Sequence, residues 1–291
     1  MGIVRGMSFE DYLSIEAVSN SDMKLLSRSP WHWKNRVPLV PTRPMLCGSL
    51  AHCAQLEPDA VDARYVFVPE DAPRRPTDAQ WNAVKSNESS MRAKDWWRDF
   101  EAGVRGRVLI EAKEYEITKQ QLAALKQNDE IREVLATGDS EVSMFWIDPK
   151  TGVYCKARPD HIHVTRTGLV KMPDLKAMAD DTPAAVQRSI GRMGLYRQQV
   201  HYMRGYEVIT GKPVDDFFFA VVSSVPPVLA MPHRITFDAI EQGIEEVDEL
   251  LAEFARCQKS DHWPAYKPEQ RMHSLPAWLK TVGEVEVEFE Q

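Results

Sequence analysis

The chain of 291 residues contains few cysteines and no long apolar run. Neither a zinc ribbon nor a disulfide framework is indicated, because no C-x-x-C pair occurs among the cysteines Cys47, Cys53, Cys155 and Cys257. No apolar run approaches the roughly 18 residues that a membrane span needs. The first residues, M-G-I-V-R-G-M-S-F-E-D, lack the apolar core of a signal peptide, and Gly6 stands where a myristoylation signal has Ser or Thr. We therefore expect a cytoplasmic protein that does not associate with membranes.

The chain also shows no internal repeat and no low-complexity linker. With 43% hydrophobic and 27% charged residues, it has enough apolar material for one full core. The simplest expectation is one compact α/β domain over residues 1–291, with a helical embellishment at its N-terminus.

The net charge of −7 argues against a nucleic-acid partner, but the charges are unevenly distributed. Residues 150–212 contain eleven Lys and Arg against five Asp and Glu, whereas residues 213–291 contain six against fifteen. A polyanion would be attracted to the first region and repelled by the second. Two ordinary solvated faces explain the same numbers, so charge alone leaves both interpretations open.

Hydrophobic periodicity divides the chain into parts. Residues 1–45 are expected to be helical, residues 44–58 to form a buried helix that ends at Pro58, and residues 59–140 to form a helical insertion. Residues 141–235 alternate in the manner of strands, with two helices among them, and are the predicted core sheet. Residues 236–291 predict a long amphipathic helix followed by an acidic tail.

The stretch from Lys156 to Lys176 carries the chemistry. It reads K-A-R-P-D, then a short alternating segment, then M-P-D-L-K. Because side chains two apart in a strand point the same way, Asp174 and Lys176 are expected on one face and Leu175 on the other. Asp160 reaches that face if the two strands pair. Two carboxylates and an ammonium at one point suit Mg²⁺ and a phosphate or an activated water.

Each of these features also has an ordinary explanation. The two carboxylates and the lysine could be a surface salt bridge. His52 lies among apolar and small residues, where a histidine is more often a hydrogen-bonded core residue than a ligand. Serines at a helix start are usually only caps. The tryptophans of the insertion could stack on bases, but packing in a core or interface is the commoner use; they are Trp81, Trp96 and Trp97.

Taken in order, these segments resemble the PD-(D/E)xK nuclease superfamily, with its restriction-endonuclease-like core of a central mixed sheet flanked by helices. More narrowly, the chain is similar to the nuclease domain of exodeoxyribonuclease VIII, the RecE type, and to its phage and prophage relatives. The segments that carry the resemblance are S-N-S-D-M-K-L-L-S-R-S-P-W-H-W, G-S-L-A-H-C-A-Q-L-E-P, S-E-V-S-M-F-W-I-D-P-K-T-G-V-Y-C-K-A-R-P-D, D-L-K-A, L-Y-R-Q-Q-V-H-Y and S-L-P-A-W. D-x-K alone would be a weak signal, whereas the ordered set covers nearly the whole chain.

The resemblance implies a metal site. By position, His52, Asp160 and Asp174 match metal-binding residues of the family, and the backbone carbonyl of Leu175 would be a further ligand. Lys176 matches the lysine that orients or activates the attacking water. The implied cofactor is Mg²⁺, for which Mn²⁺ would substitute.

Further residues are implied less directly. Glu141 stands where related nucleases carry an additional acid, with a direct or a supporting role. Gln199 and Tyr202 resemble the helix-borne Gln and Tyr that steady the site or contact DNA, although Gln198 has the four-residue spacing to Tyr202 that the superfamily often uses. Two more residues would form a 5′-phosphate pocket, namely Ser21 and Arg158.

The implied activity is 5′→3′ degradation of one strand of linear duplex DNA, which leaves 3′ single-stranded tails for recombination. A ring-like oligomer and a single-strand annealing partner are implied with it. The chain departs from the family in two places. Ala177 stands where relatives commonly have Thr, and Pro173 cannot donate to a sheet ladder, so an edge or a bulge is expected there. An endonuclease of the same superfamily and a non-catalytic DNA-binding or assembly module remain alternatives.

Overall fold

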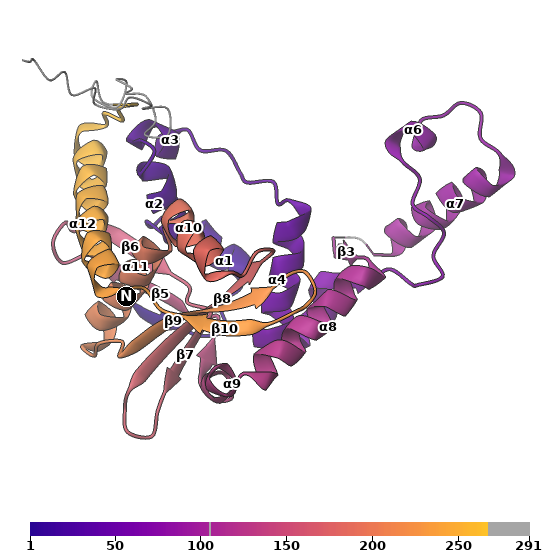
Figure 1. The fold of residues 1–291 in the computed structure, drawn as a ribbon. Coiled ribbons are helices and arrows are strands. Elements are labelled where there is room, and N and C mark those ends of the chain that lie inside the picture. The colour runs from indigo at the N-terminus through magenta and orange to yellow at the C-terminus, as the bar shows by residue number, and fades with distance from the viewer. Residues whose placement is uncertain (105, 267–291) are drawn as a thin grey trace, which may run out of the picture.

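A central mixed sheet flanked by helices forms the body of the protein, as a computed structural model shows for residues 1–104 and 106–266 (Figure 1). The sheet has five strands in the order β10-β9-β8-β7-β4, in which only β8 and β9 run parallel. These strands are β4 (Asp139–Ser140), β7 (His161–Val164), β8 (Val170–Met178), β9 (Asp216–Ser223) and β10 (Ala230–His233). The α/β fold with a central mixed sheet is therefore confirmed.

A smaller antiparallel sheet lies beside it, in the order β1-β5-β6. Its strands are β1 (Gly2–Val4), β5 (Ser143–Ile147) and β6 (Tyr154–Ala157). The predicted hairpin of β5 and β6 is present, and its turn is held by Asp148, whose Oδ2 accepts hydrogen bonds from the Thr151 backbone N–H at 2.9 Å and hydroxyl at 2.7 Å. The hairpin leads directly to Asp160.

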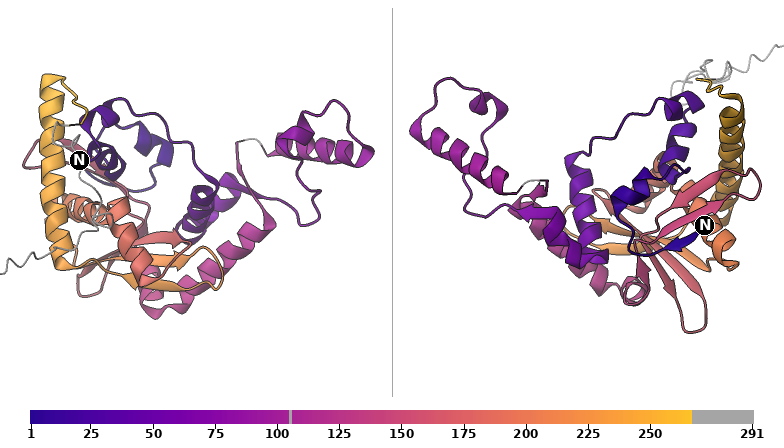
Figure 2. Two further views of the ribbon diagram at one scale, coloured as in Figure 1. Left: turned by 45° about the horizontal axis from the view of Figure 1, so that its top comes forward. Right: turned by 180° about the vertical axis from the view of Figure 1, so that it is seen from behind.

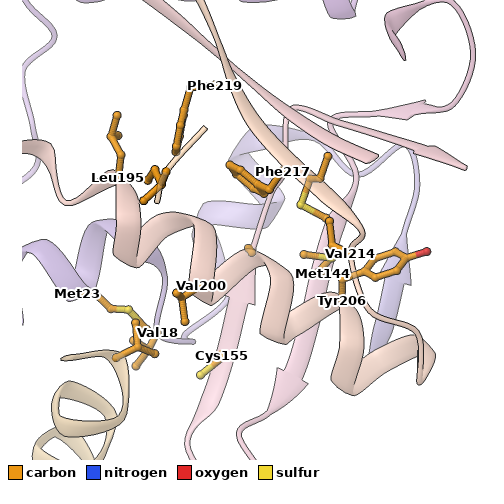
Figure 3. Packing of buried hydrophobic residues seen from close by; sticks show 14 of the residues in the cluster. Val18, Met23, Met144, Cys155, Leu195, Val200, Tyr206, Val214, Phe217 and Phe219 are labelled. Atoms are coloured by element: carbon orange, nitrogen blue, oxygen red, sulfur yellow. The ribbon is translucent and has the colours of Figure 1, made fainter. Parts of the chain in front are cut away.

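Two helical layers cover the two faces of β8 and β9. On one face lie α8 (Ala112–Gln127) and α9 (Asp129–Leu135), which pack on Leu175, Phe218 and Ala220. On the other face lie α11 (Leu195–Thr210) and α12 (Phe237–Ser260), with α10 (Pro183–Met193) beside them. Figure 3 shows that second core, where Phe217 and Phe219 meet residues of α11 and of the smaller sheet. Because both of its faces are covered, β9 reads as a continuous apolar run.

The N-terminal helices form the wall of a cleft. They are α1 (Phe9–Ser14), α2 (Asn20–Leu26) and α3 (Pro30–Lys34), and an extended segment, residues 36–42, connects them to α4 (Arg43–Leu56). The capping box of α2 is made by Ser19 with Asp22, so Ser19 is the N-cap and Ser21 is already helical.

Residues 59–140 do not form one insertion. Their first part contains a short 3₁₀ turn (Pro58–Ala60), α5 (Val61–Arg64) and the parallel pair β2 (Tyr65–Phe67) and β3 (Val108–Ile110). Between these strands, α6 (Asp78–Trp81) and α7 (Glu88–Gly103) project away from the sheet (Figures 1 and 2). The helices α8 and α9 that follow belong to the main core.

Two expectations fall outside the described residues, namely the S-L-P-A-W segment and the acidic tail. Within residues 1–104 and 106–266, no helix is both long and apolar enough to cross a membrane.

Candidate active site

Strand β8 presents Asp174 and Lys176 on its α11 face. Asp174 is buried, with 1% of its surface exposed, and accepts hydrogen bonds from the Lys176 ammonium and from the Gln198 amide of α11. Leu175, between them, packs under α8 and α9 on the opposite face. The period of two along a strand therefore places these side chains as the sequence predicted.

The side chain of Asp160 contacts the backbone of β8. Its Oδ2 accepts a hydrogen bond from the Leu175 N–H at 2.6 Å. Because β7 pairs with β8 only as far as Lys171, this N–H has no strand partner on that side. The carboxylate of Asp160 thus accepts the hydrogen bond that a neighbouring strand would otherwise accept, and this bond fixes it beside Asp174 and Lys176.

The unpaired side of β8 also explains why a proline is tolerated at position 173. Residues two apart in a strand direct their N–H groups to the same side. The nitrogen of Pro173, like the N–H of Leu175, therefore faces the side of β8 where Asp160 lies and not β9. No ladder bond to β9 is lost by the proline. The edge expected at Pro173 is therefore present, on the side of β8 that is not paired with β7 beyond Lys171.

His52, Glu141 and Asp160 come together at this edge. Each offers a ligand atom, and all these atoms lie within 4.8 Å of one another. His52 is carried by α4, whose other side is anchored by buried Leu50 and Cys53. The cluster joins three segments that are far apart in the chain, and the donors are a nitrogen and carboxylate oxygens, which suit a divalent cation.

The imidazole of His52 supports the metal assignment. Its Nε2 lies 2.8 Å from the carbonyl oxygen of Leu175, and its Nδ1 lies 3.5 Å from Asp160 Oδ2. Neighbouring ligands of an octahedral Mg²⁺ are about 3 Å apart, given metal–ligand distances of about 2.1 Å. A carbonyl oxygen only accepts, so Nε2–H donates this hydrogen bond to Leu175; once that proton is lost, the same spacing fits adjacent positions on one ion. The predicted ligands His52, Asp160 and Leu175 O are therefore adjacent, and Glu141 lies beside them.

Asp174 is placed differently from the other predicted ligands. Both its oxygens are engaged, one by Gln198 and the other by Lys176, and it is not part of the His52–Glu141–Asp160 cluster. The Lys176 ammonium stands against Asp174 as a positive charge. Asp174 thus fixes Lys176 in this state of the site, and its role as a ligand stays a prediction.

Glu141 has the backbone of a constrained residue. Its φ is 52°, in the left-handed region that few non-glycine residues adopt, and its N–H donates to the Asp160 carbonyl at 3.0 Å. Its Oε2 accepts from Arg158 Nε at 2.7 Å. Arg158 Nη1 in turn donates to the Met7 carbonyl and the Ser143 hydroxyl, both at 3.0 Å. Arg158 therefore holds Glu141 towards the cluster.

Electrostatics at the cluster favour a cation. Burial and the charge of Asp174 raise the pKa of Asp160, and burial and the charge of Asp160 raise the pKa of Glu141. Burial alone would lower the pKa of Lys176, but Asp174 and Asp160 raise it above its usual value. Carboxylates that destabilise one another in this way are stabilised by a bound cation.

Helix α11 supplies Gln198 and Tyr202. Gln198 holds Asp174, whereas Gln199 points elsewhere, with its Nε2 3.6 Å from Met203 Sδ. Tyr202 lines the cleft, and burial together with the charge of Asp174 raises its pKa well above the usual value. The structure thus brings Gln198 and not Gln199 to the site, at the four-residue spacing from Tyr202.

The site opens into a cleft of about 2190 Å³. Lys176 and Tyr202 line it, as do residues of α2 and of the extended segment 36–42. Ser21 lines the same cleft and is exposed. Arg158 also borders it, but its side chain is only 7% exposed and its Nε and Nη1 are occupied as described.

The basic block of the sequence is largely neutralised within the molecule. Arg197 pairs with Glu246 at 2.6 Å, and Arg204 pairs with Asp248 at 2.7 Å, so α11 and the acidic α12 attract each other. Lys156 is buried and donates to three carbonyls at the end of α1, the nearest being Ile15 O at 2.6 Å. These cations shape the scaffold and do not form an open basic surface.

Comparisons with known proteins agree with this geometry. The model of a family described as a PDDEXK-like domain of unknown function, DUF3799, matches residues 15–271. The chain belongs to this family. A crystal structure from Eubacterium rectale, described as a putative exonuclease, is 14% identical with a TM-score of 0.60, and the match covers 93% of this chain and 95% of that one. A second solved structure, 14% identical, has a TM-score of 0.25 and a match that covers 70% of this chain and 86% of that one. No curated protein matches the chain.

For a PDDEXK-like domain, the two motif halves are recognisable. Pro159 and Asp160 supply the first half, and the D-L-K of β8 supplies the second. Nucleases of this superfamily generally depend on a divalent metal, and the cluster of His52, Glu141 and Asp160 is the candidate site for it.

Two residues of this PDDEXK-like site were not singled out by sequence reasoning. Lys24 of α2 lines the cleft, within reach of the charge of Lys176. Asn20, one helical turn before it, lines the cleft as well. Their i, i+4 spacing places both on one face of a helix, and that spacing was the available signal.

Proposed function

We propose that this protein is a metal-dependent exodeoxyribonuclease that acts on the ends of linear duplex DNA, of the RecE type. The observation that carries the proposal is the cluster of His52, Glu141 and Asp160 beside the Lys176 ammonium, in a cleft large enough for a nucleic-acid strand. A fold shared with a protein described as a putative exonuclease supports the same interpretation.

The residues have distinct tasks in this proposal. A divalent ion held by His52, Asp160 and the Leu175 carbonyl, with Glu141 adjacent, would polarise the scissile phosphate and lower the pKa of a water. Lys176 remains protonated, positions the attacking water and offsets the negative charge that develops on the phosphate.

The supporting residues keep that arrangement rigid. Gln198 and Asp174 hold the lysine in place, and Arg158 holds Glu141. Tyr202, which keeps its proton under all ordinary conditions, offers a hydroxyl at the wall of the cleft.

The finer features of the proposal rest on the resemblance to RecE-type nucleases. They are 5′→3′ polarity, 3′ single-stranded products, Mg²⁺ as the ion with Mn²⁺ as a substitute, a ring-like oligomer, and a single-strand annealing partner in phage or prophage recombination. Ser21, exposed in the cleft, is the residue we propose for contact with a 5′-phosphate. The native mass of the protein in solution tests the oligomer.

Digestion of linear and closed circular duplex with Mg²⁺ tests the activity. Linear DNA labelled at its 5′ ends should lose label as mononucleotides from the start, while the same DNA labelled at its 3′ ends should keep its label in shortening strands. Closed circles should stay intact. Cutting of circles would show an endonuclease of the same superfamily, early loss of the 3′ label would reverse the polarity, and binding without cleavage would show a non-catalytic module.

A further inference from the structure

One face of α2 lines the cleft, close enough to Lys176 and Asp174 for their charges to act on it. Asn20 and Lys24 lie one turn apart on this helix and both line the cleft. The apolar anchors of α2 are Met23 and Leu26, which belong to the main core, and Asn20 is buried on the same helix. Lys24, which is only half-buried, is therefore not needed to attach the helix.

Lys24 is a cation without an acidic partner. Within residues 1–104 and 106–266 its ammonium takes part in no ion pair or hydrogen bond, although the side chain is half-buried. Burial and the charges of Lys176 and Arg197 lower its pKa, against the attraction of Asp174. Both oxygens of Asp174 are already engaged by Gln198 and Lys176.

This arrangement costs folding free energy, because a partly desolvated ammonium lies near other cations with no counter-ion of its own. A phosphate in the cleft would remove that cost by supplying the missing negative charge. Lys156, by contrast, is buried and donates to three carbonyls.

Asn20 is an unsatisfied acceptor. It is 9% exposed, and its Oδ1 is buried with no hydrogen-bond partner among the described residues. A buried acceptor without a donor is uncommon in folded proteins and destabilises the protein that contains it. Because Oδ1 has almost no exposed surface, the amide has to turn toward the cleft before an N–H or O–H group of a ligand can satisfy it.

We propose that Asn20 and Lys24 form a nucleotide subsite of the cleft, in which Lys24 binds a non-bridging phosphate oxygen and Asn20 accepts a hydrogen bond from the base of the same strand. The subsite rests on the proposed nuclease function and adds to it residues of α2 that position the strand in the cleft. Both are positioning residues, since neither lies at the metal cluster.

Binding of a blunt linear duplex in Ca²⁺ buffer, measured by fluorescence anisotropy over a range of salt, tests Lys24. In Lys24→Gln the dissociation constant should rise by about 10-fold, and the slope of log K against log salt should become less steep by about 0.9, the value for one phosphate contact. Arg28→Gln is the matched control. Arg28 lies four residues away, is exposed and does not line the cleft, so the same loss of charge there should leave the slope unchanged.

Asn20→Leu separates a binding role from a structural one. The substitution replaces an unsatisfied amide with an apolar side chain of similar size, so the melting temperature should be kept or raised while duplex binding weakens several-fold. A melting temperature that falls together with binding would mean that Asn20 only supports the fold, and would overturn its part of the subsite.

The outcomes also separate the subsite from the proposed function. If the wild type cleaves linear duplex and Lys24→Gln binds with the same affinity and slope as Arg28→Gln, the subsite is wrong and the nuclease stands. If the wild type cleaves nothing but duplex binding depends on Lys24, the nuclease is wrong and the subsite stands.

Discussion

The pair of Asp174 and Lys176 lends itself to a double-mutant cycle. The side chain of Asp174 is 2% exposed and that of Lys176 is 17% exposed, and each is the other's charged partner. Lys176→Met removes the ammonium with little change of shape and leaves a buried carboxylate. Asp174→Asn removes the negative charge and places an amide group against the ammonium.

Breaking a buried ion pair by removing one partner typically costs about 3–5 kcal/mol, because the remaining charge is desolvated and unpaired. Lys176 is partly exposed, so about 3 kcal/mol is expected for each single variant. In the double variant Asp174→Asn/Lys176→Met no charge remains unpaired, and Gln198 can still donate to the amide oxygen introduced at position 174. We expect the double variant to lose about 1 kcal/mol, which gives a coupling of about 5 kcal/mol in the cycle.

Urea unfolding of the four proteins at neutral pH and in EDTA measures this coupling without interference from a metal. All three variants should be inactive on linear duplex, even though the double variant regains stability. Single-variant losses that simply add, with a coupling below about 0.5 kcal/mol, would refute the view that these two side chains form one buried electrostatic unit.

Two further predictions concern the scaffold, and a third concerns the candidate site. Burial lowers the pKa of His201 to about 4, below its value in the unfolded chain, so the unfolded chain binds more protons in acid. The free energy of unfolding should therefore fall by about 2 kcal/mol between about pH 7 and about pH 5. His201→Gln should flatten that part of the profile of unfolding free energy against pH, measured with urea. Gly205→Ala would place a Cβ 2.7 Å from ring atoms of buried Trp146, and should cost about 1–3 kcal/mol in the same assay. Arg158→Met releases the carboxylate of Glu141, and should lower metal affinity or nuclease activity by about 10- to 100-fold.

Each of these has a control in the same chain. His163→Gln makes the same substitution at a half-buried histidine and controls for the chemical change itself. Gly191→Ala adds a Cβ with nothing within 4 Å in a helix, and should stabilise the protein slightly. Arg132→Met removes an exposed arginine and should leave activity unchanged. A control that behaves like its partner variant would contradict the corresponding explanation.

Much of the fold could be predicted from local patterns. The hairpin of β5 and β6, the buried strand β9 and the long helix α12 all follow from periodicity and turn residues. The insertion was harder, because an amphipathic helix shows that it has an apolar face but not what covers it. For that reason α8 and α9 were assigned to the insertion, although they pack on the central sheet.

The candidate site shows the same division. The strand period places Asp174 and Lys176 on one face, and family resemblance points to His52. Gln198 and Gln199 could not be separated, because neighbours on a helix differ by only about 100° in direction and the helix phase depends on packing. The position of Arg158 behind Glu141 depends on contacts between distant segments, which no local pattern reports.

The charge pattern was the weakest guide. A basic and an acidic block along the chain suggested an attractive and a repulsive surface for a polyanion. In the fold, Arg197 and Arg204 of α11 face Glu246 and Asp248 of α12, so part of this asymmetry is an internal contact. Charge counted along a sequence says little about which charges reach solvent.

The most direct test of the central claim compares the wild type with Lys176→Met and Asp160→Asn on 5′-labelled linear duplex, with and without Mg²⁺. The wild type should release label only when Mg²⁺ is present, and both variants should lose at least about 100-fold in activity while they remain folded. Undiminished cleavage by either folded variant, or cleavage by the wild type in EDTA, would contradict a metal-dependent nuclease centre at this site.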